Sequence, residues 1–230
     1  MNVMRVVILQ MAAEVGPGQI QDWLRWRGLS WRLYRLDEEP DVPPLDTIDL
    51  LIVLDGPVAA LNQATGQSAA ALIERALAEG KRILGIGLGG HLIACALGAE
   101  ADGPAVPDVG WTDLELHRAA RQSPLGIMLP HRLVALQWAP WRFSLPRGAV
   151  PLYGASASRY QGFVWHERVV ALPCHLQTKP ADIEQLLRAR PDAPFSDSTS
   201  RRHSQGLCAA LRTSCYRVLD YLSGPHADLT

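Results

Sequence analysis

The chain has 230 residues, of which 48% are hydrophobic and 20% charged, and its formal net charge at neutral pH is -1. A chain of this length can bury one sizeable core, so composition favours a folded globular protein. A near-neutral chain has no basic surplus with which to attract phosphates, which disfavours nucleic acid and anionic membranes as partners. We expect instead a small neutral, zwitterionic or amino-acid-like ligand.

Neither a membrane span nor a metal site is predicted. No continuous apolar run reaches the roughly 18 to 20 residues that a membrane helix needs, and residues 1–11 hold one short apolar run that is typical of a strand rather than of a leader. We therefore expect a soluble, cytoplasmic protein. The four cysteines, Cys95, Cys174, Cys208 and Cys215, form no Cys-x-x-Cys pair. This spacing favours reduced thiols, with no structural metal and no cofactor.

The first hundred residues alternate between strand-like and helix-like segments. Continuous or alternating apolar runs predict strands at residues 3–9, 30–36, 49–54 and 81–86. Helical spacing of apolar residues predicts helices that end near Gly28, Gly80 and Gly98, the last two covering residues 67–79 and 88–97. Strands that alternate with helices indicate a parallel sheet with helices on both faces. The fold class expected is therefore α/β, a flavodoxin-like, doubly wound and mostly parallel sheet.

The pattern changes beyond about residue 112. Short strands separated by tight turns are predicted at residues 113–117, 132–138, 149–153, 162–165 and 169–174, which indicates a small antiparallel addition to the parallel core. A helix is expected at residues 181–190, a loop at 191–200 and a final helix at 203–222. In terms of domains, residues 1–190 should form one unit, and residues 191–230 a loop and helix packed on it.

Two glycine-rich loops mark the place where a ligand should bind. In open parallel sheets the ligand site lies beyond the carboxyl ends of the strands, where this chain has Asp55-Gly56-Pro57-Val58 and Gly85-Ile86-Gly87-Leu88-Gly89-Gly90. The second loop has the strand-to-helix form of a nucleophile elbow, in which the side chain of the central residue projects above a helix N-terminus. A cysteine there would gain thiolate character. The central residue here is Gly87, which has no side chain that could attack a substrate.

Several short motifs resemble those of the class I glutamine amidotransferases, in particular stand-alone proteins similar to the amidotransferase domain of GMP synthase. The resemblance runs from residue 3 to about residue 183. It is carried by Gly16-Pro17-Gly18, Gly56-Pro57, the elbow around Gly87, Gly110-Trp111, Gln137-Trp138, Leu145-Pro146-Arg147-Gly148-Ala149 and His175.

The resemblance implies particular roles for these positions. In that family a cysteine at the elbow attacks the glutamine amide, a His-Pro-Glu segment supplies the base and its orienting acid, and the ammonia passes to a synthetase. Gly87 falls on the nucleophile, His175 on the base and Gln177 on the acid, while Gly56 and Leu88 fall on the backbone donors of the oxyanion hole. The family's Trp-His-Gly-Asp segment is replaced here by Trp138-Ala139-Pro140-Trp141. Altered segments at three places indicate that glutaminase function has been lost.

Other residues admit two interpretations each. His91, one helical turn beyond Gly87, could touch a ligand or be an ordinary helix-surface histidine. Pro57 and Gln137 are candidate ligand-binding residues. Trp138 and Trp141 could form an apolar wall over the former glutamine pocket, although an aromatic pair in a sheet loop is more often a packing or subunit contact. The cysteines are expected to be packing residues. The glycine run also satisfies G-x-G-x-x-G, a weak nucleotide-binding signal because no acidic residue ends a following strand.

Three functions from different classes remain open. The favoured one is a non-catalytic amidotransferase-like protein that binds a ligand or partner, for example a synthetase or another biosynthetic enzyme subunit. The second is an enzyme of different chemistry, a hydrolase or lyase, that uses His175 and the surviving oxyanion donors. The third is an interaction protein that docks a partner, or a second copy of itself, through its carboxyl-terminal segment and tryptophan-rich loops.

Overall fold

The computed structural model describes residues 4–100, 110–138, 143–155, 158–189 and 198–224. Its strands are β1 Arg5–Gln10, β2 Ser30–Arg35, β3 Leu50–Val53, β4 Arg82–Ile86, β5 Gly110–Leu116, β6 Arg132–Gln137, β7 Val150–Ala155, β8 Ser158–Trp165 and β9 Val169–Leu172. Its α-helices are α1 Gly18–Arg27, α2 Ala64–Ala78, α3 Leu88–Ala96, α4 Pro124–Met128, α5 Pro180–Ala189 and α6 Ser198–Ser223. Single 3-10 turns lie at Leu45–Thr47, Val58–Asn62 and Ala120–Gln122.

The described strands form one nine-stranded sheet in the order β2-β1-β3-β4-β9-β8-β7-β5-β6. Neighbouring strands are parallel from β2 to β9 and antiparallel from β9 to β6. The parallel half has the strand order of a doubly wound fold, as predicted. The antiparallel part was wrongly expected to be small, because β5 to β8 extend the sheet by four strands.

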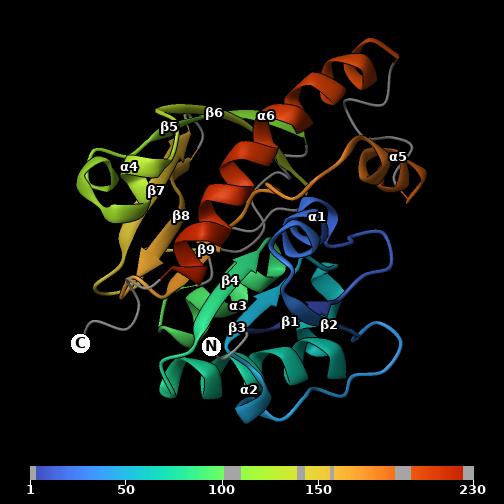
Figure 1. Cartoon of the computed structure of the whole chain (residues 1–230), viewed down its shortest axis with the longest axis vertical. Helices are drawn as coiled ribbons and strands as arrows, with labels where there is room; N and C mark the ends of the chain where they lie inside the picture. Colours follow the sequence, from blue (N-terminus) through green and yellow to red (C-terminus); the bar gives the residue numbers. More distant parts are fainter. Residues whose placement is uncertain (1–3, 101–109, 139–142, 156–157, 190–197, 225–230) are drawn as a thin grey trace.

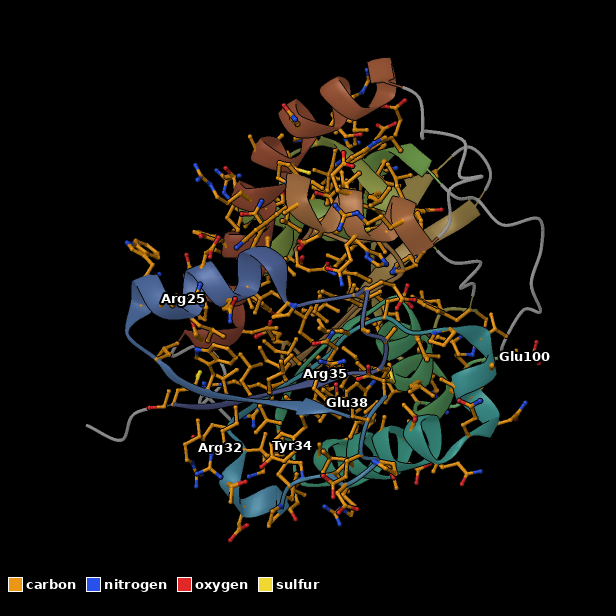
Figure 2. The ribbon with its side chains drawn as sticks, turned by 90° about the vertical axis from the view of Figure 1, so that its right-hand side faces the viewer. Arg25, Arg32, Tyr34, Arg35, Glu38 and Glu100 are labelled. Carbon is orange, nitrogen blue, oxygen red and sulfur yellow. The ribbon has the colours of Figure 1, made fainter. Side chains whose placement is uncertain are left out.

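The inner parallel strands β1, β3, β4 and β9 are mainly apolar because helices cover both of their faces, whereas the edge strand β2 is exposed or half-buried along its length. Successive side chains of a strand point to opposite faces, so Val6 and Ile8 of β1 lie in one core and Val7 and Leu9 lie in the other. Figure 2 shows the sheet close to edge-on, with α1 and α2 on opposite sides of the edge strand β2, on which Arg32 and Tyr34 are labelled. The double burial explains the unbroken hydrophobic runs in the sequence.

The helices divide between the two faces. Apolar residues of α1, α5 and α6 belong to the first core, and those of α2 and α3 belong to the second. Figure 1 shows α6, in red, lying across the sheet close to α1. The buried apolar residues described on α6 are Cys208, Leu211, Cys215, Val218, Leu219, Tyr221 and Leu222, and most of them are related by spacings of three, four or seven positions. This spacing gives a helix one continuous apolar side, with which it packs on the sheet.

The structure moves several predicted boundaries. α6 begins at Ser198, five residues before the expected start and within the expected loop, and β9 ends at Leu172 rather than at residue 174. The short helix α4 follows Ser123, whose hydroxyl accepts a hydrogen bond from the Gly126 N–H, and was not anticipated. Among the helices of the described residues, none combines the length and the apolar character that crossing a membrane requires.

Candidate functional site

The turn from β4 to α3 has the elbow conformation that the glycine pattern predicted. Gly87 adopts φ 57° and ψ -118°, a region that residues with a side chain enter only under strain. Its N–H donates to the Leu172 carbonyl of β9 at 2.8 Å, and its carbonyl accepts from the His91 N–H at 3.0 Å. Gly87 is therefore fixed between the sheet and the first turn of α3.

Close packing explains the glycines around the elbow. A Cβ on Gly89 would overlap the Val53 carbonyl of β3, and a Cβ on Gly85 would lie 2.6 Å from the Gly89 carbonyl oxygen. A Cβ on Gly90 would lie 2.9 Å from the Leu172 carbonyl oxygen of β9. Gly85 and Gly90 of the G-x-G-x-x-G run therefore let α3 approach the strands at backbone distance, which accounts for these glycines without a nucleotide. The N-terminus of α3, where a phosphate would sit, already holds another anion.

That anion is the carboxylate of Asp55, which follows β3 and has 1% of its surface exposed. Its Oδ1 accepts hydrogen bonds from the Gly56 N–H at 2.8 Å and the Leu88 N–H at 2.6 Å. Leu88 is the first residue of α3, so the carboxylate also lies at the positive end of a helix dipole. The two N–H groups predicted to form an oxyanion hole are thus present, and both donate to Asp55.

His175 completes this cluster from the other side. It follows β9 and is held by its backbone, because its N–H donates to the Leu136 carbonyl at 2.8 Å. Two residues further, the Gln177 carbonyl accepts from the Gln19 N–H in the first turn of α1 at 2.7 Å. The segment that carries His175 is therefore fastened both to β6 and to α1.

The side chains of His175 and Asp55 form a buried pair. The Nε2 atom of His175 lies 2.9 Å from Oδ2 of Asp55, and each side chain is 1% exposed. An ionised carboxylate can only accept, so Nε2 carries a proton and donates it. With that nitrogen engaged by Asp55, His175 is not positioned to take a proton from a nucleophile.

Gln177 is a weak support for the imidazole ring. Its Nε2 lies 3.4 Å from Nδ1 of His175, which is long for a hydrogen bond, and its Oε1 is buried with no hydrogen-bond partner among the described residues. A neutral amide at this distance cannot stabilise an imidazolium as a carboxylate would. The shorter hydrogen bond of the ring is on its other side, from Nε2 to Asp55.

Asp55 also occupies the space that a side chain on Gly87 would need. A Cβ built on Gly87 would overlap Asp55 Cγ and would lie 2.5 Å from Asp55 Cβ. The Asp55 carboxylate therefore fits at this place because position 87 has no side chain.

The other predicted site residues are spread around this cluster. Gly56 is buried, whereas Pro57 is exposed at the start of a 3-10 turn. His91 is buried one turn beyond Gly87, and its Nε2 lies 3.6 Å from the Cys95 sulfur. Gln137 and Trp138 are buried next to Leu136, which bonds His175, and Trp138 belongs to the core that α1 and α6 share. Residues 139–142, including Trp141, lie outside the described residues.

The cysteines behave as expected with one exception. Cys174, Cys208 and Cys215 are buried in the core, and burial raises the pKa of the Cys174 thiol to about 12. Cys95 was wrongly expected to be a packing residue, since it is exposed on α3. Within the described part of the chain, no group of three or more histidine, cysteine or acidic side chains could hold a metal ion.

The cluster is closed to solvent in the described structure. Asp55, His175 and Gln177 have at most 2% of their surface exposed. A hollow of about 780 Å³ lies elsewhere, lined by residues of β5, β6 and β7 and of the turn at 117–121, such as Glu115, Arg121 and Arg132. None of the cluster residues lines that hollow, so the geometry describes a closed site rather than an open pocket.

Comparison with known proteins agrees with this fold. A glutamine amidotransferase from Methylobacillus flagellatus superposes with a TM-score of 0.85 at 21% identity, over 96% of this chain and 94% of the other. A glutamine amidotransferase from Thermotoga maritima gives 0.85 at 21% identity, over 97% and 100%. A candidate GMP synthase subunit from Thermoplasma acidophilum gives 0.59 at 17% identity, over 92% and 97%.

At these identities the comparison establishes the fold alone. No protein-family model matches the sequence, and no curated protein is significantly similar to it. The chain therefore has the fold of the glutamine amidotransferases, a mixed α/β sheet with helices on both faces.

Sequence reasoning missed the residue that defines the site. Asp55 was noted only as part of a glycine-rich loop, with no role. One signal could have identified it, namely an acidic residue directly after a buried strand and beside the elbow on the neighbouring strand. Its contact with His175, 120 positions away, depends on the fold.

Proposed function

We propose that this protein is a glutamine amidotransferase-like protein that has lost glutaminase catalysis and acts by binding a partner. The observation that carries the proposal is the carboxylate of Asp55, which accepts both hydrogen bonds of the former oxyanion hole and pairs with His175. The proposal treats residues 1–190 and the final helix as one domain.

Two requirements of amide hydrolysis are unmet at this site. Position 87 has no nucleophilic group, and Cys95, two turns further along α3, is directed to the protein surface. Catalysis through an oxyanion also needs N–H donors that are available to the developing charge. Here both donors already bind the Asp55 side chain, so neither N–H is available to an oxyanion.

The same observation weakens the idea of an enzyme of different chemistry. A hydrolase or lyase that used His175 and the oxyanion donors would first have to displace Asp55 from all three contacts. Loss of its partners would leave a charged carboxylate in a buried place, which costs several kcal/mol. Asp55 and His175 are each 1% exposed, so a substrate has no open position beside them.

The partner role is supported by the proteins that share this fold. One structure of the same fold is a candidate GMP synthase subunit, which by that description is one part of a larger enzyme. On the α1 surface Trp26 is 66% exposed and stacks on Tyr216 of α6, with the Arg27 guanidinium above its ring. Tryptophan, tyrosine and arginine are enriched at protein interfaces, so this surface suits contact with a biosynthetic enzyme.

Ammonia release from glutamine by the purified wild-type protein tests the proposal. We expect none, and we expect no heat of glutamine binding in calorimetry, because the cluster is closed. Gly87→Cys alone should also be inactive, because Asp55 lies where the new side chain must go. The matched variant is Asp55→Gly with Gly87→Cys, which supplies a thiol and removes the obstruction.

The double variant and the wild-type protein test different parts of the proposal. Activity in the double variant that disappears on adding His175→Ala would show that the remaining donors still support amide hydrolysis. Ammonia release by the wild type that His175→Ala abolishes would contradict the proposal, because it would require a nucleophile at the site.

A further inference from the structure

We propose that the Gly56 N–H, the Leu88 N–H and His175 Nε2 form a binding site for a carboxylate, and that Asp55 is its built-in ligand. This inference deepens the proposed function and rests on it for the interpretation of the site as non-catalytic. It assigns a ligand class to the cluster, small monocarboxylates.

The donors match a carboxylate in number and direction. Gly56 lies in the loop after β3 and Leu88 begins α3, 32 positions later, yet both N–H groups reach one oxygen at 2.8 and 2.6 Å. His175, from a third segment, reaches the other oxygen at 2.9 Å. Three donors from three segments that converge on two oxygens are a built anion site, and charge-assisted hydrogen bonds of this length are strong.

The surrounding structure holds these donors in place even without Asp55. Gly87 N–H is bonded to Leu172, His175 N–H to Leu136, and Gln19 N–H to Gln177, all through backbone groups that do not involve Asp55. A Cβ on Gly56 would lie 2.9 Å from Met11 Cβ, so this loop is also packed closely. Removal of the Asp55 side chain should therefore leave a preformed cavity with unsatisfied donors.

The size of that cavity follows from covalent structure. The side chain of aspartate is a methylene and a carboxylate, which is acetate less one hydrogen. Asp55→Gly removes both groups and leaves a space shaped for acetate. Asp55→Ala keeps the Cβ and leaves room for formate alone. Engineered cavities in protein cores are known to bind small molecules that fit them.

The experiment is a thermal-unfolding titration of Asp55→Gly and Asp55→Ala with sodium acetate, sodium formate and, at equal ionic strength, sodium chloride. A ligand that binds only the folded state stabilises it by an amount that grows with the logarithm of its concentration above the Kd. We expect each tenfold rise in acetate above that Kd to raise the unfolding midpoint of Asp55→Gly by about 3 to 5 °C, and chloride to have no such effect. Formate should stabilise both variants, and acetate should fail with Asp55→Ala.

Three controls test whether the response to acetate arises at this site. Asp49→Ala removes a carboxylate that is bonded to Arg5 at the protein surface, and this variant should show no specific response to acetate. Asp55→Gly combined with His175→Ala should lose most of the acetate response, because one of the three donors is gone. Wild type should not respond, since its site is filled.

Clear outcomes contradict the inference. It fails if Asp55→Gly responds alike to acetate and chloride, or if wild type gains as much as the variant. If Asp55→Gly does not fold in chloride, the folded fraction recovered on refolding is measured in acetate and in chloride instead of the unfolding midpoint. Equal recovery in the two salts would contradict the proposed site. Glutamine hydrolysis is measured separately, so the carboxylate site and the loss of catalysis can fail independently.

Discussion

His175 Nε2 lies 2.9 Å from Asp55 Oδ2, and both side chains are almost completely removed from solvent. One partner follows β3 and the other follows β9, so the contact joins the two loops that flank β4 in the sheet. In this arrangement the imidazole is hydrogen-bonded to a carboxylate of its own chain.

The first prediction concerns the coupling between positions 55 and 87. Gly87→Cys should lower the free energy of unfolding by about 3 kcal/mol, because overpacking typically costs about 1 to 3 kcal/mol and the positive φ adds about 1 to 2. The same substitution in an Asp55→Gly background should cost at least about 1 kcal/mol less, because the obstructing carboxylate is absent. Urea unfolding of all four proteins measures this. Equal costs in both backgrounds would mean that the two side chains do not compete for space.

The second prediction concerns removal of the imidazole. His175→Ala should destabilise the protein by about 3 kcal/mol, because it leaves the buried Asp55 carboxylate without the hydrogen bond from the imidazole. His131→Ala, at an exposed position, is the matched control and should change stability by no more than about 0.5 kcal/mol. His175→Gln, which can still donate to Asp55, should lose less than His175→Ala. A loss for His175→Ala as small as that for His131→Ala would argue against a stabilising pair.

The third prediction concerns thiol reactivity. Burial raises the pKa of Cys174 and of Cys208 to about 12 and raises that of Cys215 still further, so these thiols are almost entirely protonated and shielded at pH 8. Cys95 is exposed, although partial burial raises the pKa of its thiol as well. A disulfide reagent should therefore modify one thiol per native chain, increasingly fast with rising pH, and all four after unfolding.

Cys95→Ser provides the control for this measurement. The native variant should show no rapid modification, while three thiols should react in denaturant. Rapid reaction of a second thiol in the native protein would show that one of the core cysteines is accessible.

The fourth prediction concerns acid stability. A hydrogen bond from the Arg5 guanidinium lowers the pKa of Asp49 below its ordinary value of 3.8 in the folded chain. Because the folded-state pKa is the lower one, the stabilisation is present above about pH 4 and is lost as the pH falls further through the folded pKa. Both side chains are partly exposed, so the effect should stay below about 1 kcal/mol.

Arg5→Ala should accordingly reduce stability at pH 7 more than at pH 2.5, as measured by urea unfolding at both values. In an Asp49→Asn background the same substitution should have an equal effect at the two pH values. A pH-independent loss in the wild-type background would show that Arg5 acts through packing alone.

Local sequence patterns determined much of the architecture. Uninterrupted apolar runs such as that of β3 predicted doubly covered strands, because a strand between two helix layers has no face for polar side chains. The elbow at Gly87 was predicted correctly. The backbone conformation of this strand-to-helix turn requires glycines, and they lie close together in the sequence, where a local pattern can be recognised. The true start of α6 was missed, because Ser198 to Arg202 are polar and their helical state depends on continuation into the apolar spacing that begins near Cys208.

Only the tertiary structure decided what the site contains. The sequence by itself determined that Gly87 cannot attack a substrate, because that conclusion needs one residue and its local geometry. It could not determine that Asp55 fills the space beside Gly87, or that His175 pairs with Asp55 across 120 positions. Such contacts depend on which strands become neighbours in the sheet, and strand order is set by the burial of the whole chain rather than by any local pattern.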